Sequence, residues 1–127
     1  MRLTTIAMRA AFVLLIAACV ISVAAEPTVT TVKGYVLDSA CAFTKNIAKP
    51  ISKECAISCA KAGSQLVILT DTGQIYWPIS DATPAVGQNE KLLPFAAQKV
   101  TVTGKVFVRG GSHAIVIEKI EPEPMAK

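Results

Sequence analysis

Charge and aromatic rings are both scarce in this chain of 127 residues. Charged side chains make up 17% of it, below the usual quarter, and aromatic side chains make up 6%. Hydrophobic side chains make up 52%, which excludes the composition of a fully disordered protein. The length suffices for one small domain rather than two. The hydrophobic excess is uneven, because 20 of the first 25 residues are hydrophobic and the remainder is ordinary.

The motifs of several large enzyme classes are missing. The chain has neither a Gly-rich phosphate loop nor an H-E-x-x-H sequence, and it has no nucleophile elbow. Its single histidine, His113, falls beside a predicted turn, where we expect an exposed side chain. The acids Asp38, Asp71, Asp81 and Glu90 fall in predicted loops or turns, where we expect solvated carboxylates. These absences favour a protein that is not an enzyme.

The basic balance of the sequence is small once its first segment is set aside. The formal net charge is +4, but Arg2 and Arg9 both lie within the first 25 residues. Residues 26–127 carry 11 Lys and Arg against nine Asp and Glu. We therefore do not expect a nucleic-acid partner, because such proteins concentrate positive charge on one surface.

Residues 1–25 have the composition of a secretory signal peptide. Arg2 and Arg9 supply positive charge, and the apolar run at 10–23 is shorter than the roughly 20 residues of a membrane span. Small residues up to Ala25 predict cleavage after that position. We expect an exported protein, periplasmic or extracellular, with no membrane span in its mature chain.

A second processing signal overlaps the first. Ile16–Cys19 (IAAC) resembles the bacterial lipobox, whose cysteine is lipidated and becomes the first residue. Its use would anchor the protein to a membrane through Cys19. The residues after Cys19 are apolar instead of forming the usual polar tether, so cleavage after Ala25 is the preferred interpretation.

One domain is predicted over residues 26–121, followed by a flexible tail at 122–127. Its class is mainly β with one short helix, and its architecture is a small five-stranded antiparallel barrel of the oligonucleotide/oligosaccharide-binding type, here called OB-like. An α+β roll or a small sandwich is the alternative. We expect strands at 32–37, 66–70, 75–77, 99–108 and 114–120, a helix at 52–62 between the first two strands, and a plug at 91–97.

Several details support these elements. Residues 66–70 form an unbroken apolar run, which predicts a strand buried on both faces. Val100, Val102, Val106 and Val108 alternate with polar residues and are expected to share one face. Gly34 lies inside the first strand, where it predicts a bulge or a bend. Residues 26–31 are expected to form a polar lead-in, and residues 38–49 an irregular segment.

Three cysteines follow the predicted cleavage site: Cys41, Cys55 and Cys59. Cys55 and Cys59 are one helical turn apart, a relation that rarely allows a bond between them. A disulfide from Cys41 to either one would stabilise the fold by about 3 kcal/mol. The third thiol would then be buried or would link two chains in a dimer. Two other interpretations stay open: all three thiolates bind a soft metal such as Zn²⁺ or Cu⁺, or the thiols are core residues or a redox pair.

Two further groups are candidate sites. Asp38 and Ser39 form the most site-like polar cluster, although a local Asx-type turn accounts for them equally well. Tyr76 and Trp77 offer a stacking surface for bases or sugars. Adjacent strand residues point to opposite faces, so at most one of these two aromatic side chains belongs to the core.

Six segments carry a resemblance to a known family: Gly34–Cys41 (GYVLDSAC), Cys55–Gly63 (CAISCAKAG), Ile75-Tyr76, Lys91–Ala96 (KLLPFA), Val100–Val106 (VTVTGKV) and Ile117–Ile120. Over nearly all of residues 33–121 the chain resembles small exported bacterial proteins of unknown function with an OB-like barrel. The last two strands are also similar to exported bacterial OB-fold proteins linked to stress tolerance and ligand binding.

The family resemblance implies a fold and an export route but supplies no catalytic residues. Its members often carry a histidine shortly after the first cysteine, where this chain has Phe43 and Thr44. That departure weakens the transfer of a metal site. The sequence thus predicts an exported, non-enzymatic binding or structural module, stapled by a disulfide and needing no cofactor. Its partner would be an unknown small ligand or protein; Zn or Cu binding and thiol redox activity are the alternatives.

Overall fold

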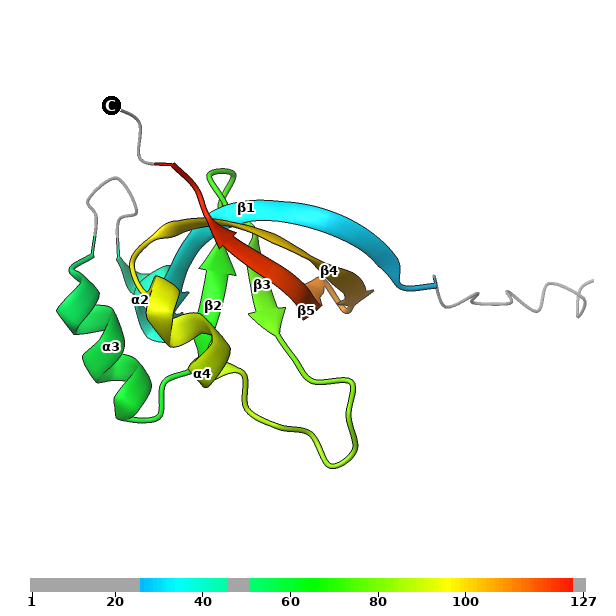
Figure 1. Ribbon diagram of the computed structural model, residues 1–127, viewed down its shortest axis with the longest axis horizontal. Coiled ribbons are helices and arrows are strands. Elements are labelled where there is room, and N and C mark those ends of the chain that lie inside the picture. The colour runs from blue at the N-terminus through cyan, green and yellow to red at the C-terminus, as the bar shows by residue number, and fades with distance from the viewer. Residues whose placement is uncertain (1–25, 46–50, 125–127) are drawn as a thin grey trace, which may run out of the picture.

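Five strands form a closed barrel in the computed structural model, which describes residues 26–45 and 51–124. The strands are β1 (Thr28–Asp38), β2 (Leu66–Leu69), β3 (Ile75–Pro78), β4 (Lys99–Arg109) and β5 (Ser112–Pro122), joined in the order β1-β2-β3-β5-β4 (Figure 1). All neighbouring pairs are antiparallel except β3 and β5, which are parallel. The predicted OB-like barrel is confirmed, with one parallel pair where we expected only antiparallel ones.

β1 closes the barrel by pairing with two strands in succession. Residues 28–35 pair with β4, and residues 35–38 pair with β2. At Gly34, next to this change of partner, a Cβ atom would lie 2.5 Å from the carbonyl oxygen of Leu69. Gly34 therefore permits a close approach of two backbones, and the register with β4 is continuous there. The strand begins at Thr28, so the expected polar lead-in is wrong from that residue onward.

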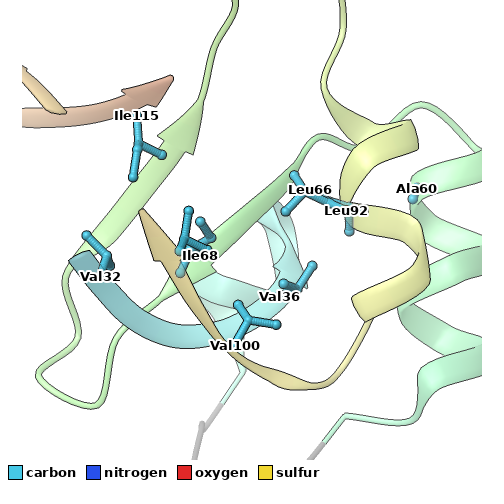
Figure 2. Packing of buried hydrophobic residues seen from close by; sticks show 9 residues of the cluster. Val32, Val36, Ala60, Leu66, Ile68, Leu92, Val100 and Ile115 are labelled. Atoms are coloured by element: carbon cyan, nitrogen blue, oxygen red, sulfur yellow. The ribbon is translucent and has the colours of Figure 1, made fainter. Parts of the chain in front are cut away.

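The barrel interior is filled by aliphatic side chains from all sides, the inner cluster: Val32, Val36, Ala60, Leu66, Ile68, Leu92, Val100, Val102 and Ile115 (Figure 2). Leu92 comes from the short helix α4 (Asn89–Leu92), which is followed by a 3-10 turn at Leu93–Phe95. Its side chain is fully buried beside those of the strands. The expected plug at 91–97 is confirmed, and this part of the chain places Leu92 inside the barrel.

A second cluster lies on the outer side of β1 and β2. This outer cluster contains Leu37, Ala42, Val67 and Leu69, with Ile51, Ile75 and Trp77 packed against it. Ala42 belongs to α2 (Ser39–Thr44), so that helix covers the strands from outside. All four residues of β2 are buried, as expected for an apolar run placed between two clusters.

The helices differ from the single one predicted. α3 (Lys53–Lys61) matches the prediction, and the Ser52 hydroxyl caps it by accepting a hydrogen bond from the Cys55 amide at 3.1 Å. The expected irregular segment after Asp38 is wrong, because residues 39–44 form α2. α4 and the 3-10 turn that follows it lie after the third strand, at the position of the expected plug.

The end of the barrel farthest from α4 departs from the simple strand alternation. Val100 and Val102 are buried as expected, but the register between β4 and β5 shifts at Thr103/Gly104. Beyond this shift Val106 still packs against the inner cluster, whereas Val108 is 61% exposed. Val108 is therefore not buried with the other three valines.

The C-terminal strand is longer than predicted. β5 runs to Pro122, and the Glu123 amide donates to the Lys99 carbonyl at 2.9 Å. The Glu123 carboxylate also pairs with Lys33 at 2.9 Å. The flexible tail predicted at 122–127 therefore begins before the strand ends. The predicted signal peptide, with Cys19, lies outside the described residues. Within those residues no helix has both the length and the apolar character needed to cross a membrane.

Candidate functional site

The carboxylate of Asp38 lies at the centre of the predicted cysteine region. Asp38 ends β1 and is 1% exposed. Its Oδ1 atom accepts hydrogen bonds from the Cys41 amide at 3.1 Å, which caps α2, and from the Ser64 hydroxyl at 3.3 Å. Oδ2 is buried and meets no hydrogen bond of regular geometry from the described residues. Asp38 thus joins the start of α2 to the segment after α3.

Buried hydrogen bonds determine the ionisation of this carboxyl group. Burial alone would raise the pKa of Asp38, since it disfavours the charged form. Hydrogen bonds from the thiol and amide of Cys41, and from Ser64, outweigh burial and hold the pKa below its ordinary value of 3.8. Asp38 is therefore a buried anion at neutral pH.

Cys41 lies beside that anion, to which its amide donates a hydrogen bond at 3.1 Å. Its side chain is 8% exposed. The hydrogen bond from its thiol to Asp38, followed by burial and the charge of Asp38, raises the pKa of Cys41 to about 12. A thiol in this environment stays protonated and is a poor nucleophile at neutral pH.

Cys55 and Cys59 lie on α3, closer to solvent. Cys55 is exposed and Cys59 is half-buried. Burial, then the negative charge of Asp38 and the neighbouring Cys55 thiol, raises the pKa of Cys59. The charges of Cys55 and Cys59 in turn contribute to the raised pKa of Cys41. The charge of Asp38 therefore acts on the thiols of Cys41 and Cys59, which belong to different helices.

Neither a disulfide nor a metal cluster is formed by these residues in the described part of the chain. Cys41, Cys55 and Cys59 are free thiols. Within residues 26–45 and 51–124, no three His, Cys, Asp or Glu side chains are grouped so that they could hold a metal ion. The disulfide and the three-cysteine metal site both stay predictions.

The predicted polar cluster is a structural joint. Besides Asp38, it contains Ser39, whose Oγ lies 3.5 Å from the Oγ of Ser64. The Ser39 amide donates to the Gln65 carbonyl at 2.8 Å. The two residues therefore tie β1 and α2 to the segment before β2, and Asp38 is a helix cap, close to the Asx-type turn that the sequence allowed.

Tyr76 and Trp77 point to opposite faces, as the strand alternation predicts. Tyr76 packs against the inner cluster and Trp77 against the outer one. The Trp77 ring lies 6.3 Å from that of Phe43, which is 68% exposed. The pair Tyr76-Trp77 therefore does not form one continuous platform, although Trp77 and Phe43 present aromatic surface outside.

His113 is more enclosed than an exposed turn residue. It belongs to β5 and is half-buried, with its ring edge-on to Tyr76 at 5.4 Å. Its Nδ1 atom lies 2.8 Å from Nε2 of the Gln74 side chain, so Nδ1 accepts a hydrogen bond from this side-chain amide. The expected exposure is wrong because β3 and β5 pair at this position.

A groove of about 850 Å³ is lined by the end of β3, by the segment that leads from β3 to α4, and by residues after α3. Figure 1 shows that the segment between β3 and α4 extends away from the barrel. Apolar parts of its wall come from Pro78, Ile79, Ala85 and Val86, and the last of these is 65% exposed. Of the described residues that line it, Glu90 alone carries a charge. The groove is thus a mixed surface of small apolar groups and neutral polar groups.

Amide side chains hold the groove in shape. The side chain of Asn89 accepts from the Leu66 amide and donates to the Ser64 carbonyl, both at 2.8 Å. Gln65 donates to the Pro78 carbonyl at 3.1 Å, and Gln88 donates to the Val86 carbonyl at 2.8 Å. Sequence reasoning missed this site, because neutral residues from separate segments form it and no motif marks them.

Comparison with known proteins adds no relative. No family model, no curated protein and no solved structure matches this chain. The function must therefore be argued from the geometry above.

Proposed function

We propose that this protein is an exported, non-enzymatic binding module that holds a small uncharged ligand in the groove beside β3. The observation that carries the proposal is the groove itself, with its volume of about 850 Å³ and its amide-rich wall. Ligand sites in proteins are concave, largely preformed and mostly apolar, with a few fixed polar groups. Its one charged lining residue, Glu90, is exposed, which does not favour acid–base chemistry.

The covering of the barrel also supports the groove as the binding site. OB-fold proteins commonly bind their ligands on strands 2 and 3 and on the adjoining loops. Here Val67 and Leu69 on the outer side of β2 are buried beneath α2 and Trp77. That part of the usual surface is closed, whereas the groove at the end of β3 is open to solvent.

A disulfide from Cys41 to Cys55 or Cys59 is the second part of the proposal. The charges of Cys55 and Cys59 contribute to the raised pKa of Cys41, and the fold is small enough to gain from a covalent staple. A disulfide donor, such as an oxidised exchange protein, would accept the two electrons. The remaining thiol would be available to a second chain if it is the exposed Cys55.

Binding of Zn or Cu through the three cysteines is the alternative. The observation in its favour is the buried Oδ2 atom of Asp38, which lacks a regular hydrogen bond within the described residues. Redox catalysis has less support, because the high pKa of Cys41, about 12, disfavours a thiolate nucleophile.

A thermal-shift screen with uncharged sugars, nucleosides and amino-acid amides tests the groove. A bound compound at 100 times its Kd raises the free energy of unfolding by about 2.7 kcal/mol, which gives a measurable rise in Tm. Gly87→Trp adds a large side chain at a residue that lines the groove, and a Cβ atom placed there has no neighbour within 4 Å. We expect the rise in Tm to disappear in this variant.

The matched control is Val108→Trp, which adds the same ring on an exposed strand end outside the residues that line the groove. It should keep the full ligand-induced rise in Tm. A rise that persists in Gly87→Trp, or a panel in which no compound raises Tm, contradicts the proposal.

A further inference from the structure

We propose that the uncharged ligand of the groove is a short aliphatic peptide with blocked ends, whose N–H groups donate hydrogen bonds to the side-chain oxygen of Gln88. This inference rests on the proposed function and narrows it from any small uncharged compound to one chemical class. Gln88 carries the inference, and Gln65 supports it.

Gln88 is a buried polar side chain with an open acceptor. It is 7% exposed and lines the groove. Its Nε2 atom donates to the Val86 carbonyl at 2.8 Å, which fixes the direction of the amide, whereas no hydrogen bond from the described residues reaches its Oε1 atom. Among those residues, the one fully buried side-chain oxygen without a partner is Oδ2 of Asp38. Oε1 of Gln88 therefore borders open space, and the groove is the space that this residue lines.

A carbonyl oxygen in so enclosed a position favours a ligand that donates to it. An acceptor removed from water costs free energy unless a donor reaches it. A ligand group that is itself only an acceptor would displace water from Oε1 of Gln88 and return nothing. The groove therefore selects for N–H or O–H groups at this point.

Gln65 repeats the arrangement at a more exposed part of the wall. Its Nε2 atom donates to the Pro78 carbonyl at 3.1 Å, and its Oε1 atom receives no hydrogen bond within the described part of the chain. Asn89 differs, because its Oδ1 accepts from the Leu66 amide and its Nδ2 donates to the Ser64 carbonyl. Asn89 thus shapes the wall, whereas the two glutamines offer oriented acceptors to a ligand.

The remaining wall favours a peptide among the donors. None of the described lining residues is aromatic, so a nucleobase would find no ring on which to stack. Pro78, Ile79, Ala85 and Val86 supply aliphatic surface, against which the many hydroxyl groups of a sugar would be buried without partners. A peptide places N–H donors next to aliphatic side chains, and this combination matches the wall.

Glu90 explains the preference for blocked ends. It is the one charged residue among the described lining residues, and it is exposed. Its negative charge disfavours a second carboxylate in the groove, whether this belongs to the end of a peptide or to an acidic side chain. A blocked peptide carries no such group.

The experiment measures the Kd of acetyl-alanyl-valyl-alanine amide by isothermal titration calorimetry. Gln88→Met keeps the length of the side chain but removes the acceptor, so the peptide should bind about 2- to 10-fold more weakly, the usual value of one neutral hydrogen bond. Gln98→Met is the matched control. Gln98 also donates from its Nε2 atom to a main-chain carbonyl, that of Pro94 at 3.3 Å, but it lies outside the groove, so the Kd should not change.

Ester analogues of the peptide test the hydrogen bond from the side of the ligand. Each replaces one N–H of the peptide by an oxygen atom, which preserves the shape and removes a donor. At least one ester should bind about 2- to 10-fold more weakly to the wild-type protein. The same ester should lose nothing further in Gln88→Met, because its missing donor and the missing acceptor belong to one hydrogen bond.

A charged peptide tests the role of Glu90. Acetyl-alanyl-aspartyl-alanine amide should bind about 2- to 5-fold more weakly than the neutral peptide. This difference should shrink in Glu90→Gln, whereas the Kd of the neutral peptide should stay the same. An equal preference in the wild-type protein and Glu90→Gln would remove the argument for blocked ends.

The outcomes separate this inference from the proposed function. Uridine or methyl glucoside that binds more tightly than the peptide, and is lost in Gly87→Trp, keeps the groove as a binding site and overturns the peptide class. Peptide binding that Gln88→Met leaves unchanged overturns the role of Gln88. If Gln88→Met does not fold, the esters decide, and equal affinity of all of them with the parent peptide overturns the inference. Failure of every probe to bind overturns both proposals.

Discussion

At the scale of single residues, Asp38 connects the end of β1 to α2 and to the segment after α3 through its hydrogen bonds. Burying an anion costs free energy unless donors surround it, and Asp38 obtains these from Cys41 and Ser64. The same carboxylate caps α2 and raises the pKa of the Cys41 thiol. One carboxylate therefore links the geometry of α2 to the chemistry of the cysteines.

This arrangement predicts a specific dependence of stability on pH. The pKa of Asp38 is lower in the folded state than its ordinary 3.8. Its contribution to stability is therefore complete above the unfolded-state pKa and is lost as pH falls through the lower folded-state pKa. Urea unfolding of the wild-type protein between about pH 5 and pH 2 should reveal a loss of unfolding free energy.

Asp38→Asn keeps a side chain that can cap α2 but removes the ionisable group. At neutral pH this variant should be less stable by about 1.5 to 3 kcal/mol. Its loss of stability in acid should be smaller than that of the wild-type protein. Asp71→Asn, at an exposed carboxylate, should keep the wild-type profile, and an identical acid profile for Asp38→Asn would argue against the role given to this residue.

Residue patterns in the sequence reached part of this site. The three cysteines and Asp38 were recognisable as candidates, because their types and spacing are unusual in a chain with so little charge. Burial of the carboxylate was not predictable, since Ser64 comes from a segment far along the chain. α2 was missed because it is only six residues long and shows no helical periodicity.

At the scale of elements, the close contact of β1 with β2 depends on Gly34. Any side chain there would collide with the backbone of Leu69, which cannot move without disturbing β2. Glycine at this position is therefore a packing requirement, and its positive-φ freedom is not needed.

Gly34→Ala should destabilise the protein by about 1 to 3 kcal/mol, the usual cost of overpacking a core. Gly87→Ala is the matched control, because a Cβ atom there has no neighbour within 4 Å. Chemical unfolding of both variants measures the difference. Equal stability of the two variants would contradict the tight approach of β1 and β2.

Elements with strong local signals were predicted well, and those fixed by distant contacts were not. α3 has a serine cap, an acid in its first turn and a lysine in its last, all visible in the sequence. By contrast, β1 extends back to Thr28 and β5 forward to Pro122 because each has β4 as a partner. Pairing between distant strands leaves no such mark on a short polar segment.

At the scale of the whole molecule, charge is balanced over the surface. Four exposed or half-exposed lysines lie in ion pairs with acids: Lys33–Glu123, Lys99–Asp71, Lys105–Asp81 and Lys119–Glu121. Such pairs contribute little to stability. Their effect is to prevent a continuous basic surface from forming on the described part of the barrel.

We expect no measurable binding to DNA or RNA at physiological salt. Residues 26–127 lack the excess of basic groups from which non-specific affinity arises, because they carry 11 Lys and Arg against nine Asp and Glu. Fluorescence anisotropy of labelled single-stranded and double-stranded oligonucleotides checks this expectation. Binding whose affinity falls steeply with salt concentration would contradict it. The aromatic surface of Trp77 and Phe43 would then be the first candidate for the contact.

The order of the strands has a consequence for how the chain acquires its fold. β1 pairs with β4 along most of its length, and β4 follows in the chain only after α2, α3, β2, β3 and α4. Contacts between such distant segments form slowly, because a long loop must close before any of them can contribute. A chain exported in an unfolded state would thus have no barrel to unfold during transport. Its first strand would find its main partner only after most of the sequence had crossed the membrane.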